Sequence, residues 1–128
     1  MTRRATFRVD AIPLSLNEWS RRRPAYIARL KADYATEVWA AVLAARQHGT
    51  WDGQRFHQAE CVVRYHFPDG QRRDPDNYTP KFLLDALVAA GVLTDDDFTH
   101  LDLRIQRGAD ARPPWVEVVV EEMSSDGG

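Results

Sequence analysis

The chain has 128 residues, 44% of them hydrophobic and 28% charged, and a formal net charge of −2. This composition excludes an intrinsically disordered chain, and we expect one globular domain over residues 1–128. No apolar run reaches the length of a membrane span, and a single cysteine, Cys61, excludes an internal disulfide, which fits a reducing cytoplasm.

Charge is distributed unevenly along the chain. Residues 1–81 carry 14 Lys and Arg against 9 Asp and Glu, whereas residues 82–128 carry 3 against 10. A basic half suits the phosphates of a nucleic acid, and an acidic half can hold cations or simply keep the protein soluble.

Alternating apolar and polar residues predict four strands. They are residues 5–12, 58–67, 100–106 and 115–123. With two helices between them, the order β-α-β-α-β-β predicts an α/β (α+β) fold with one mixed sheet and helices packed on it. Residues 13–24 are expected to form a loop.

Two helices are predicted from apolar stripes at three- and four-residue steps. The first runs from Pro24 to His48, because proline suits the first helical position and Gly49 suits the end. The second is expected to begin between Tyr78 and Pro80 and to stop at Gly91.

Two arginines and two aspartates share the loop RRDPDN just before the second helix. Asp and Asn favour turns and caps, so Asp74 and Asp76 can be interpreted as turn residues, with Asp76 or Asn77 capping the helix. The alternative is a cation site, because aspartate oxygens are hard ligands suited to Mg²⁺ or Mn²⁺.

A second acidic group, TDDD, begins at Thr94 after the helix. One interpretation is a cap, with Thr94 capping a short turn and Asp97 bonding back to it. The other is a cation site, because adjacent carboxylates at the negative end of a helix dipole repel one another. For a helix of about 18 Å and a return of about 3.3 Å per residue, Asp96 or Asp97, but not Asp95, is expected to reach Asp76.

Basic residues complete this constellation. Lys81 lies where the helix begins, either as a solvated lysine or as a partner of the carboxylates within reach of a phosphate. Arg72 and Arg73 can hold flanking phosphates. A metal-bound water is a suitable nucleophile for a phosphodiester, and a lysine can stabilise the charge that develops. The pattern indicates metal-dependent phosphodiester hydrolysis.

RRDPDN, followed by a lysine and by LLDALVAAGVLTDDD, resembles the RusA-type Holliday junction resolvases, a family common in phages and prophages. That family carries an R-D-x-D-N motif, a lysine, an L-D-A-L helix, an A-G turn and a D-D pair. The resemblance implies that Asp74, Asp76 and Asp96 are catalytic and bind the metal, and that Lys81 is catalytic. It covers about residues 70–105, with one residue more than the pattern between Asp76 and Lys81.

The resemblance also implies a homodimeric Mg²⁺-dependent endonuclease that acts on branched DNA such as a four-way junction. PLSLNEW is similar to a P-x-S-x-N loop of the family, which places its asparagine on Asn17. Trp19 is either a packing residue or a platform for an unpaired base, and the four histidines show no metal-ligand spacing. The residues expected to contact DNA are Arg72, Arg73, Asn77, Arg21, Arg22, Arg23 and Asn17.

Two other functions fit the sequence. One is a non-catalytic accessory protein of the same fold that binds branched DNA. The other is a small acidic protein-interaction domain, in which the carboxylates are caps and solubilising charge. Carboxylates that face phosphates weaken DNA binding, so their presence argues against a plain DNA-binding module.

Overall fold

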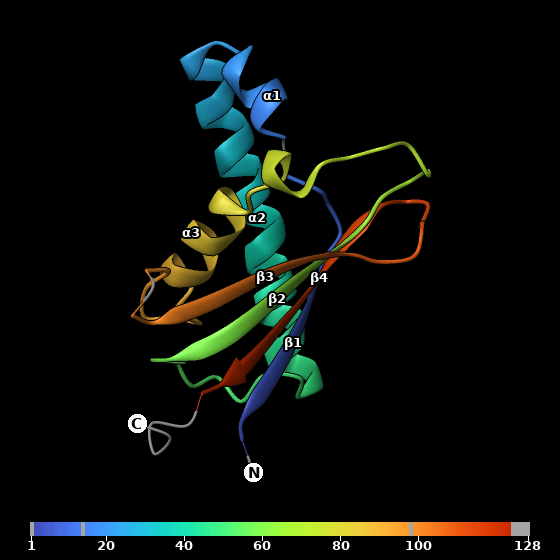
Figure 1. Cartoon of the computed structure of the whole chain (residues 1–128). Coiled ribbons are helices and arrows are strands. Elements are labelled where there is room, and N and C mark those ends of the chain that lie inside the picture. Colours follow the sequence, from blue (N-terminus) through green and yellow to red (C-terminus); the bar gives the residue numbers. More distant parts are fainter. Residues whose placement is uncertain (1, 14, 98, 124–128) are drawn as a thin grey trace.

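The computed structural model describes residues 2–13, 15–97 and 99–123. Its elements in chain order are β1 (Arg4–Val9), α1 (Leu16–Ser20), α2 (Pro24–His48), β2 (Ala59–His66), the 3-10 helix η1 (Pro75–Asn77), α3 (Lys81–Ala89), β3 (Leu101–Arg107) and β4 (Trp115–Glu122). Four strands and two main helices confirm the predicted order and the mixed sheet (Figure 1).

Local signals account for the ends of the two main helices. α2 has the predicted bounds, with Pro24 in its first turn and Gly49 at φ 78°, a left-handed conformation that glycine adopts without strain. α3 begins at Lys81, one residue later than expected, because Pro80 occupies the position before the helix. It ends before Gly91, which has φ 80°.

The expectation of a loop over residues 13–24 is wrong, because α1 forms within it. The Ser15 hydroxyl accepts a hydrogen bond from the Glu18 backbone N–H at 3.3 Å and lies 3.2 Å from the Glu18 carboxylate. Ser15 therefore caps the N-terminus of α1, and the Ser-x-x-Glu pattern typical of such caps is present in the sequence.

The sheet has the strand order β1-β4-β2-β3. β4 pairs antiparallel with both β1 and β2, whereas β2 and β3 are parallel, with Ala59 opposite Leu101 and Tyr65 opposite Arg107. α3 lies in the connection between the two parallel strands, as such a crossover requires. β1 and β3 are the two edges of the sheet within the part of the chain that the structure describes.

The molecule has two layers, with the main helices packed on one face of the sheet (Figure 1). The core joins inward-facing strand residues to the helices, and its fully buried members include Phe7, Val63, Val118, Val38, Leu83 and Leu87. The other face is polar, with the Arg64–Glu117 ion pair between β2 and β4. None of the described helices is long and apolar enough to cross a membrane.

Candidate metal and DNA-binding site

Asp74 lies directly before η1 and is exposed. Its side chain is 60% exposed and makes no cap hydrogen bond, and its Oδ1 atom is 3.4 Å from Nε of Arg72. Asp76 lies within η1, and its side chain falls outside what the structure describes. Because Pro80 occupies the cap position of α3, the expectation that Asp76 or Asn77 caps this helix is wrong.

Two hydrogen bonds hold η1 in place. The Asn77 side-chain oxygen accepts from the Asn17 backbone N–H at 2.9 Å, which brings together two asparagines that lie 60 residues apart. The Tyr65 hydroxyl donates to the Tyr78 carbonyl at 2.6 Å. These bonds fix η1 near the carboxyl end of β2 and tie it to α1.

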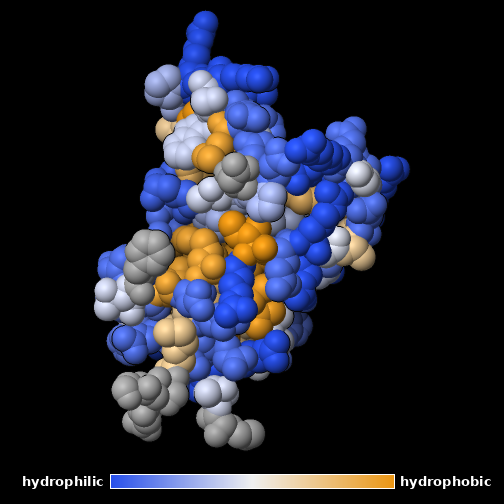
Figure 2. All heavy atoms as spheres, viewed as in Figure 1, coloured by the Kyte–Doolittle hydropathy of each residue, from blue (hydrophilic) through white to orange (hydrophobic). Residues whose placement is uncertain are grey.

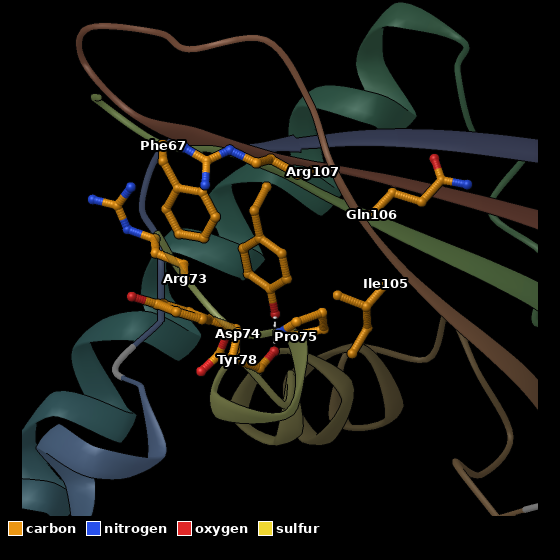
Figure 3. A pocket seen from close by; sticks show the side chains of 9 residues that line it. Phe67, Arg73, Asp74, Pro75, Tyr78, Ile105, Gln106 and Arg107 are labelled. Carbon is orange, nitrogen blue, oxygen red and sulfur yellow. Dashed lines mark hydrogen bonds between the residues drawn. The ribbon is translucent and has the colours of Figure 1, made fainter. Parts of the chain in front are cut away.

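The two neighbouring arginines of the loop have different environments. The Arg73 side chain is only 15% exposed, bonds the Asp69 carboxylate at 3.0 Å, and places its guanidinium 4.3 Å from the Phe67 ring centre. The Arg107 guanidinium is 5.0 Å from the same ring, so Arg73 from the loop before η1 and Arg107 from the end of β3 both lie beside Phe67 (Figure 3). Arg72, at 89% exposed, is the one whose guanidinium is open to a phosphate.

A hollow of about 60 Å³ separates η1 from β3. Asp74 and Pro75 line it from one side, and Ile105 and Arg107 line it from the other (Figure 3). Asp74 is therefore beside the carboxyl end of β3.

Lys81 is the first residue of α3 and is paired with a carboxylate that the sequence analysis did not consider. Its Nζ atom lies 3.5 Å from Asp85, one helical turn away, and Lys31 of α2 approaches the same carboxylate at 3.6 Å. The four-residue spacing between Lys81 and Asp85 was the available signal.

The second acidic segment is organised by Asp97. The Asp97 carboxylate accepts from the backbone N–H groups of Thr99 and His100 at 3.0 and 3.1 Å. It also lies 2.7 Å from Nδ1 of His100, and this hydrogen bond lowers the pKa of the Asp97 carboxyl. The predicted cap at Thr94 is wrong, since the Thr94 hydroxyl lies 2.7 Å from His57 and Asp97 caps the turn that follows it.

Asp95, Asp97 and His100 each offer a ligand atom, and these atoms lie within 4.8 Å of one another. Such a group of carboxylate and imidazole donors can hold a divalent cation. Asp96 is half-buried next to this group, and its backbone N–H donates to the Asp95 carboxylate at 2.8 Å. His100 was missed in the sequence, although Asp-x-x-His spacing is readable there.

The expectation that Asp96 or Asp97 returns to the start of α3 is wrong. After α3 the chain runs beside Phe56, where the Thr94 backbone N–H donates to the Phe56 carbonyl at 3.0 Å. At the start of β2, the Ala59 backbone N–H donates to the His100 carbonyl. Near the end of β2, the Tyr65 hydroxyl donates to the Tyr78 carbonyl. Six residues of β2 span about 20 Å, so the two acidic segments lie at opposite ends of α3 (Figure 1).

The basic turn between α1 and α2 is exposed. Arg21 and Arg22 lie in it, and Arg23 occupies the cap position of α2. The Arg22 guanidinium lies 5.4 Å from the centre of the Tyr26 ring. The turn is joined to η1 through α1 by the bond between Asn17 and Asn77.

No protein-family model matches the chain, and a search of curated proteins finds no significant relative.

The contrast between the two loop arginines is testable. Arg73→Met should lower the free energy of unfolding by about 1 kcal/mol or more, because the largely buried guanidinium loses its hydrogen bonds to Asp69 and Gln71 and its contact with the Phe67 ring. Arg72→Met should change stability by no more than about 0.5 kcal/mol. If this loop holds DNA, as the motif resemblance implies, Arg72→Met should instead weaken binding to a four-way junction and reduce the slope of log K against log salt by about one. Urea unfolding and fluorescence anisotropy measure the two effects, and equal loss of stability in both variants would contradict the assignment.

Proposed function

We propose that the protein is a Mg²⁺- or Mn²⁺-dependent endodeoxyribonuclease that cuts branched DNA as a homodimer. The observation that carries the proposal is the position of the acidic segments, one beside each end of the edge strand β3. Asp74 lies beside its carboxyl end, and the Asp95–Asp97–His100 group lies beside its amino end.

β3 has the properties of a pairing edge. Its register with β2 directs the backbone groups of Asp102, Arg104 and Gln106 inward, so those of Leu103 and Ile105 point away from the sheet. Unpaired strand edges readily pair with another chain. Hydrophobic residues also gather over α3 and β3 in the view of Figure 2. Leu103 and Ile105 of β3 are half-buried.

An antiparallel pair of β3 strands, centred on Arg104, satisfies these groups. Leu103 of one chain then lies opposite Ile105 of the other, with their outward backbone groups bonded. Each Arg104, which is 3.8 Å from Asp102 in its own chain, lies diagonally opposite Asp102 of the second chain. Hydrogen bonding favours this arrangement, and the two diagonal Arg104–Asp102 pairs offset the repulsion between the two Arg104 side chains that face each other across the axis.

The same pairing brings the two acidic segments together. Because Leu101 of one chain lies opposite Arg107 of the second, the Asp95–Asp97–His100 group of the first approaches Asp74 of the second. Two equivalent sites arise, and a two-fold dimer matches two opposed strands of a four-way junction. A site with both acidic segments needs two chains, since within one chain about 20 Å separates them.

The donor set suits a hard divalent cation that keeps some of its waters. When bound, the cation supplies an activated water and neutralises charge on the scissile phosphate. The carboxylates of Asp74, Asp76 and Asp96 would hold it, as the motif resemblance implies, and Asp95, Asp97 and His100 lie next to Asp96. Lys81, 56% exposed and 3.5 Å from Asp85, would stabilise the departing oxygen, which is the role that the motif resemblance implies. Exposed Arg72 and the basic turn hold the flanking DNA backbone.

We expect Asp74→Asn to abolish Mg²⁺-dependent cleavage of a labelled four-way junction while the protein stays folded, because the exchange keeps the size of the side chain and removes a metal-binding charge. Asp10→Asn is the matched control, since Asp10 is exposed at the other edge of the sheet. EDTA should stop the wild-type reaction. Junction binding without cleavage in Mg²⁺ would support an accessory protein, and neither binding nor cleavage would support a protein-interaction domain.

The β3 interface predicts a charge-sensitive dimer. In the Arg104→Asp variant, the two new carboxylates join the two Asp102 carboxylates around the two-fold axis. Their repulsion should make this variant monomeric and inactive. Arg8→Asp, at the opposite edge, is the control, because the two arginine side chains are 59% and 58% exposed. Sedimentation velocity gives the oligomeric state. A dimeric, active Arg104→Asp variant would contradict the interface.

A further inference from the structure

A second hollow lies where α1, the start of α2 and the start of α3 meet. Its volume is about 370 Å³, within the range of roughly 300–1,000 Å³ found for ligand sites. Its lining includes Trp19, Arg22, Ala28, Lys31, Lys81 and Phe82. The hollow lies apart from the cation group of Asp95, Asp97 and His100, and adjoins η1 through Lys81.

The charge of this hollow favours an anion. Arg22, Lys31 and Lys81 contribute three positive charges to its lining. One carboxylate opposes them, since Lys31 and Lys81 share Asp85 at 3.6 and 3.5 Å. Both lysine side chains remain more than half exposed, so their ammonium groups can also reach a ligand.

The hollow also has an aromatic wall. The rings of Trp19 and Phe82 meet edge to face with centres 5.2 Å apart, and Lys31 lies 5.8 Å from the centre of the Phe82 ring. The small side chain of Ala28 on α2 also lines the hollow. Aromatic rings next to cations are the combination that binds single-stranded nucleic acid, because bases stack on the rings and phosphates pair with the cations.

We propose that this hollow binds one unpaired nucleotide of the DNA substrate. Its base packs against the half-buried Trp19 ring, which contacts the buried Phe82 ring, and its phosphate pairs with Lys31 and Lys81. The inference rests on the proposed function and deepens it. It specifies the substrate as branched DNA in which a base next to the cleaved strand is unpaired and unstacked. Paired duplex has no free base to offer.

The direct test follows the indole N–H signal of Trp19 by NMR in ¹⁵N-labelled protein, with EDTA present so that no cleavage occurs. Trp19→Phe identifies the signal among the four tryptophans of the chain. The probes are the dinucleotide pdTpdT, thymidine and inorganic phosphate. We expect pdTpdT to shift the Trp19 signal at concentrations about five-fold or more below those that thymidine or phosphate requires.

Ala28→Leu fills the hollow without changing its charge and should weaken pdTpdT binding about five-fold or more. Ala32→Leu, one turn further along the same helix and outside the lining, is the matched control and should bind as the wild type does. If Ala28→Leu does not fold, Lys31→Met replaces it, with the same expected loss.

Three outcomes would overturn the inference: an unmoved Trp19 signal, phosphate binding as tightly as pdTpdT, or equal effects of Ala28→Leu and Ala32→Leu. Cleavage of a junction by the wild-type protein in Mg²⁺ is measured separately. If the protein cleaves the junction but pdTpdT does not shift the Trp19 signal, only the nucleotide site in the hollow is contradicted. If pdTpdT binds but no junction is cleaved, only the proposed nuclease activity is contradicted.

Discussion

The parallel pairing of β2 with β3 is the constraint on which the rest of the structure depends. Parallel neighbours need a crossover along the full length of the strands, and α3 provides it. The segment before α3 and the segment after it must therefore lie at opposite ends of the sheet. Asp74 and Asp97 are separated for this reason, and the edge strand between them, β3, is the one at which we propose that a second chain pairs.

Packing also divides the basic residues into structural and available groups. Arg73 and Arg107 are engaged by Phe67 and by the Asp69 segment, so their charges stabilise the loop that carries Asp74. Arg72 and the turn between α1 and α2 are exposed. The proposed DNA path follows the second group, and it leads past η1 to the hollow next to Trp19.

Much of the fold was predictable because its signals are local. Proline and glycine define α2, and alternation defines all four strands, whereas the Ser-x-x-Glu signal of α1 was overlooked. The position of Asp96 was not predictable, because chain length limits how far a segment can reach but not its direction. Arg72 and Arg73 could not be distinguished either, since Phe67 and Asp69 make the difference through folded contacts.

Mixed dimers test the shared site most directly. One chain carries Asp74→Asn, and the other carries Asp95→Asn with Asp96→Asn, which leaves the Asp97 cap intact. Each variant alone should be inactive. After equal mixing and exchange, half of the dimers combine the two chains and each has one intact site, so nicking of a junction should return to about one quarter of the wild-type level. A mixture as inactive as its components would show that the site is not shared between two chains.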